Sequence, residues 1–282
     1  MSDGVREAIE GSPYARRLGV KLDRLGEDSA RLVLPFQDEN TNPGGVLHGG
    51  VAASLSALGA TAVAHAVLGG EALPLHVAQI QVSYLAAAKR EPVAAEARLL
   101  RRGKTLCFVA VEVATEEGKP IAQASATVRG RFGEAPASRE PVPTTRDAGD
   151  PGPLGPHVVK TPFMARLGLR VEHMMDARSR LVLPGAPENT DGAGGIHPGA
   201  LLALLDTTGA MAAWATTGPG PFKASTPSLQ ARVLAPPPPG DLVAHGRLVA
   251  RDGDLFWTQV DVAASDGGRV AEGSVLYRIV TS

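Results

Sequence analysis

Two places in the sequence hold residues whose types and positions could do chemistry. His48 and Gly49 stand directly before a long apolar stretch that reads as a helix, and backbone N–H groups at a helix start stabilise developing negative charge. Asp206 stands inside a second apolar stretch, ALLALLDTTGAMAAW, where an unpaired carboxylate is costly to bury. An amide donor can polarise a carbonyl group, and a buried carboxylate can act as general base or nucleophile.

These two places are related by an internal duplication. The segment PYARRLGVKLD from Pro13 aligns without a gap with PFMARLGLRVE from Pro162, at an offset of 149 residues (162 − 13). The same offset pairs Gln81 with Gln230. A chain of 282 residues is long for one domain, so we expect two similar domains. The predicted division is a first domain at 1–132, a solvated linker rich in Pro, Gly and Asp at 133–156, and a second domain at 157–282.

Hydrophobic patterning predicts the same order of elements in each copy. In the first copy, the expected helix lies near 49–68, and short apolar or alternating runs predict strands at 19–25, 29–35, 76–85, 93–100, 106–115 and 120–132. A helix that is apolar nearly all round must be enclosed, and a curved antiparallel sheet can wrap it. The prediction is an α+β protein of two tandem hotdog domains packed as a pseudo-dimer, with the two helices side by side and the sheets joined edge to edge.

The candidate stretches resemble the hotdog thioesterases of the phenylacetate-degradation (PaaI-like) type, whose signature is Asn, then His-Gly-Gly, then an acidic residue on the helix. The resemblance covers both copies, as Asn42-Pro-Gly-Gly-Val-Leu-His48-Gly49-Gly50 and as Asp191-Gly-Ala-Gly-Gly-Ile-His197-Pro198-Gly199. The family's acidic position lies nine residues after the histidine, which is Asp206 in the second copy (206 − 197) and Ala57 in the first (57 − 48). The second copy has also lost an amide, because proline carries no N–H.

The resemblance implies an active site shared between two domains, with Asn, His and the Gly amide from one and the carboxylate from the other. One complete set then remains, in which Asn42, His48 and Gly49 face Asp206. The family also places a hydroxyl on the strand after the helix, and among Ser225, Thr226 and Ser228 the register favours Thr226. The opposite set is expected to be inactive, because Pro198 and Ala57 supply neither an amide nor a carboxylate. His197 is then expected to keep only a structural role.

The implied activity is hydrolysis of the thioester of an acyl-CoA at one composite site. No resident cofactor or metal is expected, and coenzyme A enters only as part of the substrate. Whether Asp206 acts as general base or as nucleophile stays open. A non-catalytic acyl-CoA-binding or regulatory protein is the alternative, because half of the signature is degenerate, and an enoyl-CoA hydratase of the same fold ranks below it.

Composition limits the remaining function classes. The chain has 28 basic and 29 acidic residues, so no basic field is present to attract nucleic acid or an anionic membrane. The uncharged stretch from Val51 to Gly70 contains His65 and many small residues, which predicts a buried helix rather than a membrane span. The polar N-terminus and the single Cys107, expected to be a buried thiol, fit a cytoplasmic protein. Covalent pairs often associate further, so we expect a homo-oligomer.

Overall fold

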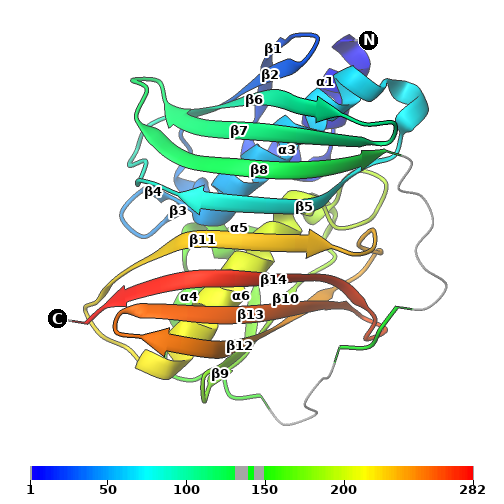
Figure 1. Cartoon of the computed structure of the whole chain (residues 1–282). Coiled ribbons are helices and arrows are strands. Elements are labelled where there is room, and N and C mark those ends of the chain that lie inside the picture. The colour runs from blue at the N-terminus through cyan, green and yellow to red at the C-terminus, as the bar shows by residue number, and fades with distance from the viewer. Residues whose placement is uncertain (1, 131–138, 143–148, 282) are drawn as a thin grey trace.

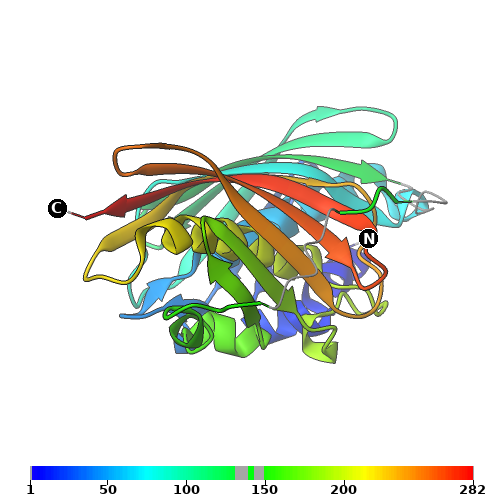
Figure 2. The ribbon, with the colours of Figure 1, turned by 90° about the horizontal axis from the view of Figure 1, so that it is seen from below.

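The protein is built on one continuous antiparallel sheet of 12 strands, with its long helices on one face (Figures 1 and 2). The computed structural model describes residues 2–130, 139–142 and 149–281. The strand order is β1-β2-β6-β7-β8-β5-β11-β14-β13-β12-β10-β9, so the first copy forms one half of the sheet and the second copy the other. The fold predicted from the sequence, two hotdog units joined edge to edge, is confirmed.

The element bounds follow the predicted strand and helix runs closely. The first half contains β1 (Lys21–Leu25), β2 (Ser29–Leu34), α3 (Gly49–Leu68), β5 (Leu75–Tyr84), β6 (Val93–Arg102), β7 (Leu106–Thr115) and β8 (Pro120–Gly130). The second half contains β9 (Arg170–Met175), β10 (Arg178–Leu183), α6 (Pro198–Thr217), β11 (Lys223–Val233), β12 (Leu242–Asp252), β13 (Leu255–Ala264) and β14 (Arg269–Val280). Both halves therefore have the order ββαββββ.

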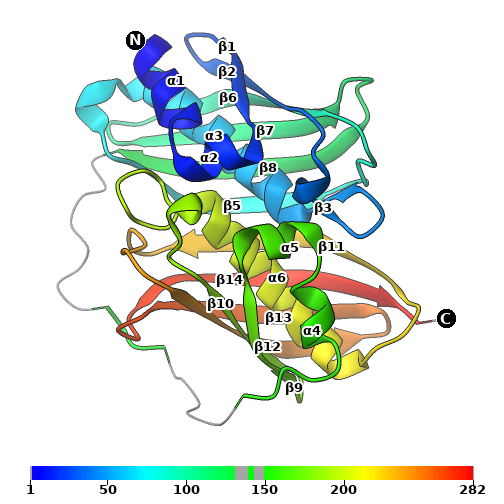
Figure 3. The same cartoon turned by 180° about the vertical axis from the view of Figure 1, so that it is seen from behind.

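The two long helices form the centre of the core. Every residue of α3 from Gly50 to Ala60 is buried, and so is every residue of α6 from Gly199 to Ala213. Small residues let the two helices approach each other closely, because a methyl group added at Gly50 would lie 2.6 Å from the Cβ of Ala203. The helices run side by side across the sheet (Figure 3). α3 is also the one helix, within the described residues, that is long and apolar enough to cross a membrane, and 78% of its most apolar window is buried inside the protein.

The halves join through β5 and β11, which pair antiparallel in the middle of the sheet (Figure 1). Gln81 pairs with Gln230 in this ladder, and these two residues are related by the repeat offset. A residue that pairs with its own counterpart marks a local twofold axis, so each position of one copy has a symmetric position in the other. This symmetry brings the start of each long helix towards the middle of its partner.

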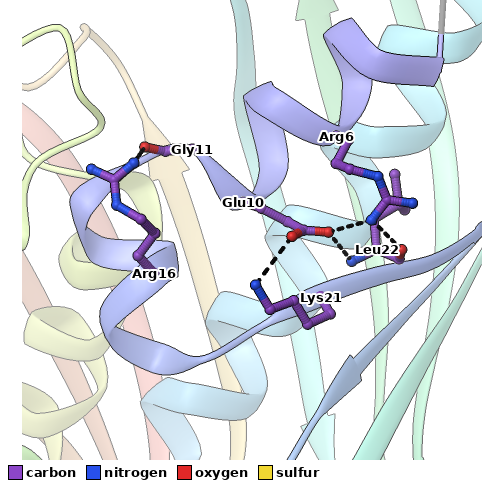
Figure 4. Close-up of polar contacts among 6 residues, drawn as sticks. All are labelled: Arg6, Glu10, Gly11, Arg16, Lys21 and Leu22. Atoms are coloured by element: carbon purple, nitrogen blue, oxygen red, sulfur yellow. Dashed lines mark hydrogen bonds and ion pairs between the residues drawn. The ribbon is translucent and has the colours of Figure 1, made fainter.

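Several short elements complete the two halves. They are α1 (Ser2–Glu10), α2 (Pro13–Leu18), β3 (Thr41–Asn42), β4 (Val46–Leu47), α4 (Gly155–Val158), α5 (Pro162–Leu167) and three single-turn helices at Asp38–Asn40, Gly70–Ala72 and Pro187–Asn189. Some of them, such as α2 and α5, also recur at the repeat offset. α1 packs on α3 and buries Val5 and Ile9 completely. Its last residue, Glu10, accepts hydrogen bonds from Arg6 at 2.6 Å, Lys21 at 3.3 Å and the Leu22 N–H at 2.8 Å (Figure 4). These contacts fasten the N-terminal helix to the start of β1.

The predicted linker, 133–156, lies partly outside the described residues, at 133–138 and 143–148. Its described parts contact the second half of the sheet. Pro141 forms a β-bridge with Gly268, and the Asp150 carbonyl accepts a 2.7 Å hydrogen bond from the Met174 N–H. α4 begins at Gly155, inside the predicted linker.

Candidate functional site

The start of α3 presents a backbone N–H at the junction of the two halves. His48 caps the helix, and its Nδ1 accepts a 2.9 Å hydrogen bond from the Gly50 N–H. Its carbonyl accepts from Val51 at 2.9 Å and Ala52 at 3.3 Å. The structure gives the Gly49 N–H no acceptor among the residues it describes. This amide is therefore available to a carbonyl oxygen, and the helix dipole supports the charge that develops there.

The His48 side chain holds this turn through its own contacts. The side chain is buried, and burial lowers its pKa to about 4, so the ring is neutral at pH 7. Because Nδ1 accepts from Gly50, Nε2 carries the ring proton. The ring also packs on Phe163 of the opposite copy, with 5.0 Å between ring centroids. These contacts fix the loop that leads into α3.

Asp206 lies on α6 and is the carboxylate nearest to this amide. Its side chain is only 4% exposed, and burial raises its pKa from an ordinary value of 3.8 to about 6. The Thr226 hydroxyl donates a 3.0 Å hydrogen bond to Oδ1, which opposes part of that rise. Thr226, the hydroxyl that the repeat register favours, contacts the carboxylate directly. Oδ1 therefore contacts Thr226, and Oδ2 is the carboxylate oxygen that Thr226 does not contact.

A bulge in β11 directs Thr226 towards Asp206. The pairing of β11 with β14 shifts register between Ser225 and Ser228, so Thr226 and Pro227 lie in the irregular segment. Bulges re-aim side chains and are common beside active sites. The first copy keeps the irregularity, because β5 shifts register against β8 between Val77 and Gln79. The residue at the repeat offset from Thr226 is Val77, which has no hydroxyl.

Gly49 and Asp206 come from opposite copies and lie directly beside each other. A methyl group added at Gly49 would lie 2.8 Å from Oδ2 of Asp206 and 3.4 Å from the ring of Tyr84. Position 49 therefore needs a residue without a side chain, and its peptide adjoins the carboxylate oxygen that Thr226 leaves free. The arrangement can polarise a carbonyl group from one side and attack it from the other.

The symmetric position keeps the scaffold and lacks the reactive groups. Nδ1 of His197 accepts a 2.9 Å hydrogen bond from the Gly199 N–H, as His48 does in the first copy. Tyr14 stacks on His197 with 4.7 Å between ring centroids, in the way that Phe163 packs on His48. Pro198 stands where Gly49 does, and Ala57 stands where Asp206 does.

Asn42 lies near this loop but is not joined to the other candidates by a side-chain hydrogen bond within the described residues. It belongs to β3, and its carbonyl accepts from the Gly45 N–H at 3.3 Å. Asn40, two residues earlier, is the asparagine that fixes the loop. Its carbonyl accepts from the His48 N–H at 3.0 Å, and its side chain donates to the Leu18 carbonyl at 2.9 Å. Asn189 makes the same two contacts in the second copy, so this asparagine is structural in both.

Two tyrosines near Asp206 were not predicted from the sequence. The Tyr84 hydroxyl donates to the Gly49 carbonyl at 3.2 Å, and the Tyr277 hydroxyl accepts from Trp214 Nε1 at 3.1 Å. Burial and the charge of Asp206 raise the pKa of Tyr84 well above its ordinary value, and burial raises the pKa of Tyr277 to about 12. Both phenols are therefore protonated near pH 7. The repeat offset could have revealed them, because it replaces both tyrosines with valine.

Known proteins resemble this chain in sequence. A family model described as the acyl-CoA thioesterase N-terminal domain matches residues 37–129, which include His48 and Gly49. The medium/long-chain acyl-CoA thioesterase YigI of Escherichia coli is 30% identical over 131 residues, which cover 41% of this chain and 83% of YigI. An esterase candidate of Saccharolobus solfataricus is 31% identical over 107 residues, covering 38% of this chain and 75% of the relative.

A solved structure supports the fold over the whole length. The acyl-CoA thioesterase II TesB2 of Mycobacterium marinum superposes with a TM-score of 0.64 at 13% identity, covering 98% of this chain and 97% of that one. At that identity the likeness concerns the fold alone. The thioesterase activity is inferred from the relatives in sequence. No comparison supports the non-catalytic or hydratase alternatives. The chain therefore belongs to the hotdog-fold acyl-CoA thioesterase family and is a thioester hydrolase.

Proposed function

We propose that this thioesterase has a single working site, assembled from both copies. The Gly49 N–H binds the carbonyl oxygen of the thioester, and Asp206 drives its cleavage. His48 caps α3, the Asn42 carbonyl accepts from the Gly45 N–H in the loop before the helix, and Thr226 orients the carboxylate. The observation that carries this proposal is the contact across the junction, where Oδ2 of Asp206 lies 2.8 Å from the Cβ position of residue 49.

The contacts of Asp206 suggest which oxygen reacts. Thr226 occupies Oδ1, so Oδ2 faces the substrate beside Gly49. As general base, Oδ2 takes a proton from water while the water oxygen adds to the carbonyl carbon, and the thiolate of coenzyme A then leaves. As nucleophile, Oδ2 adds to the carbon itself, and water hydrolyses the resulting anhydride after the thiolate has left. In both routes the oxyanion forms against the Gly49 N–H.

Other finer assignments belong to the same proposal. The PaaI-like subtype is supported by the order of Asn42, His48 and Gly49, and the division into domains at 1–132 and 157–282 by the repeat offset. We place the enzyme in the cytoplasm, where the free and buried Cys107 stays reduced. The substrate supplies coenzyme A. The exposed side chains of Leu100, Phe108, Val249 and Trp257 support a homo-oligomer.

An acyl-CoA hydrolysis assay on two variants tests the single site. Asp206→Asn removes the attacking group, and we expect kcat to fall by about 10²- to 10⁴-fold. His197→Ala alters the symmetric loop, and we expect kcat to stay within about threefold of the wild type, because no reactive group there depends on the loop. Thermal unfolding of both variants checks that they fold. Equal losses of activity would contradict a single composite site.

A further inference from the structure

Tyr84 contacts the proposed site from a third element. It is the last residue of β5, the strand of the first copy that joins the two halves of the sheet. Its hydroxyl donates to the Gly49 carbonyl at 3.2 Å, and its ring lies 3.4 Å from the Cβ position of that glycine. Asp206 approaches the same glycine from α6. The first residue of α3 is therefore held between a phenol and a carboxylate.

The repeat provides an internal comparison for this contact. The residue at the offset of 149 from Tyr84 is Val233, and the residue at the offset from Gly49 is Pro198. The hydroxyl is thus present where the helix start carries an N–H and absent where proline has removed it. The same holds for Thr226. The first copy has Ala57 at the position of Asp206 and Val77 at the position of Thr226. Each hydroxyl occurs together with the group that it contacts.

We propose that Tyr84 is a positioning residue, whose hydrogen bond to the Gly49 carbonyl holds the first residue of α3 so that the Gly49 N–H meets the thioester carbonyl. This role rests on the proposed composite site. The bond anchors α3 to the sheet at the residue where the reaction requires a fixed donor. A shift of one ångström in such a donor lowers the rate by about a hundredfold.

The protonation state of the phenol suits this role. Asp206 is the charged group that acts on Tyr84, and together with burial it keeps the pKa of the phenol high. A protonated phenol can donate to a carbonyl oxygen throughout the neutral pH range. The neighbouring peptide groups of Gly49 are uncharged.

Tyr84→Phe tests the hydroxyl, and Tyr14→Phe is its matched control. Tyr14 is a buried tyrosine whose hydroxyl lies 2.8 Å from Ser54 Oγ, and its counterpart at the repeat offset is already Phe163. We expect Tyr84→Phe to lower kcat by about 10- to 100-fold with little change in KM. We expect Tyr14→Phe to stay within about twofold of the wild type.

A spectroscopic readout separates positioning from a general structural effect. A ketone analogue of acyl-CoA, in which CH₂ replaces the thioester sulfur, keeps the carbonyl that Gly49 would polarise. With a ¹³C label, its bound C=O stretching frequency should lie below the solution value in the wild type and in Tyr14→Phe. In Tyr84→Phe it should return towards the solution value.

The outcomes distinguish this inference from the function on which it rests. If Asp206→Asn is inactive while Tyr84→Phe matches the wild type in kcat and carbonyl frequency, the positioning role is wrong and the composite site stands. If Asp206→Asn is active, the composite site itself is wrong. Should Tyr84→Phe fail to fold, 4-aminophenylalanine at position 84 keeps the ring and a hydrogen-bond donor, and 4-fluorophenylalanine keeps the size and removes the donor. We expect kcat to be about 10-fold lower or more with 4-fluorophenylalanine than with 4-aminophenylalanine, and equal values would overturn the role.

Discussion

At the scale of single residues, the proposed site depends on a glycine and an aspartate that come from opposite copies. Gly49 has to lack a side chain because Oδ2 of Asp206 occupies the neighbouring space. Asp206 is buried at a cost in stability, since burial raises its pKa from 3.8 to about 6. A costly buried carboxylate beside a free amide is typical of a site selected for chemistry rather than for stability.

The raised pKa of Asp206 predicts a pH-dependent gain in stability when the charge is removed. The folded state binds this proton more tightly than the unfolded chain does. Proton binding to Asp206 therefore contributes fully to the free energy of unfolding below about pH 4, and this contribution is lost as the pH rises through about 6. We expect Asp206→Asn to be more stable than the wild type by about 3 kcal/mol at pH 7.5, and nearly equal to it at pH 4. Urea unfolding at both pH values measures the difference, and an identical difference at the two would contradict the assignment.

The same residues show how far sequence reasoning reaches. Gly49, His48 and Asp206 could be proposed from the sequence because they match a family signature that one copy preserves and the other breaks. Tyr84 has no local signal, since a tyrosine that ends a strand is ordinary. Its contact with Gly49 depends on how β5 is placed against α3, which only the tertiary structure defines.

At the scale of elements, the distance between α3 and α6 determines whether the two reactive groups meet. Gly50 faces Ala203 at this crossing, and Gly199 faces Ser54 at the symmetric one. The Ser54 hydroxyl also donates to the Gly50 carbonyl at 2.7 Å and the Gly199 carbonyl at 3.1 Å, so it links the starts of both helices. Small residues and this link keep the helices close enough for Gly49 to reach Asp206.

A larger residue at the crossing should therefore affect both stability and activity. Gly50→Val adds methyl groups where Ala203 already lies within 2.6 Å of a Cβ position, and we expect a loss of about 3 kcal/mol in the free energy of unfolding. Turnover should fall as well, because the helices move apart. Gly70→Val is the control, since nothing lies within 4 Å of its Cβ position, and its stability should change by about 0.5 kcal/mol at most. Full activity in Gly50→Val would show that the spacing of the helices does not limit catalysis.

The long elements were predictable and the short ones were not, for a physical reason. The strands alternate apolar and polar residues and the central helices are apolar on nearly all sides, and both patterns are local signals. α2 and α5 have only six residues each, too few for a clear pattern. They are stabilised by tertiary contacts instead, since Tyr14 stacks on His197 and Phe163 packs on His48 of the opposite copy.

At the scale of the whole molecule, the twofold repeat extends to the surface. Among the described residues, seven large hydrophobic residues are at least 37% exposed, and all but Leu73 form pairs at the repeat offset: Leu85 and Leu234, Leu100 and Val249, and Phe108 and Trp257. The last two pairs lie on the β6–β7 and β12–β13 hairpins. In each hairpin the two exposed residues lie close together across the strand pair, because Phe108 pairs with the residue after Leu100 and Trp257 pairs with the residue after Val249. Neighbouring exposed apolar residues can form a contact surface. They support the proposed assembly of several chains.

Replacing the two aromatic members of this surface should weaken that assembly. We expect the wild type to be a homo-oligomer by light scattering after size-exclusion chromatography, and Phe108→Ser with Trp257→Ser to shift it towards the mass of one chain. The control is Glu27→Gln with Asp176→Asn, another pair at the repeat offset, in the β1–β2 and β9–β10 turns. The control should keep the wild-type mass. A wild type that elutes as a single chain at all concentrations would contradict the proposal.

In the proposed site one copy supplies Gly49 and the other supplies Asp206, which gives a reason for joining the two copies in one polypeptide. If the gene were split, a homodimer of the first product would bring each Gly49 opposite Ala57, with no acid to act on the bound ester. A homodimer of the second product would bring each Asp206 opposite Pro198, with no amide to hold it. Only a mixed pair would be productive, and fusion guarantees that pairing at every protein concentration.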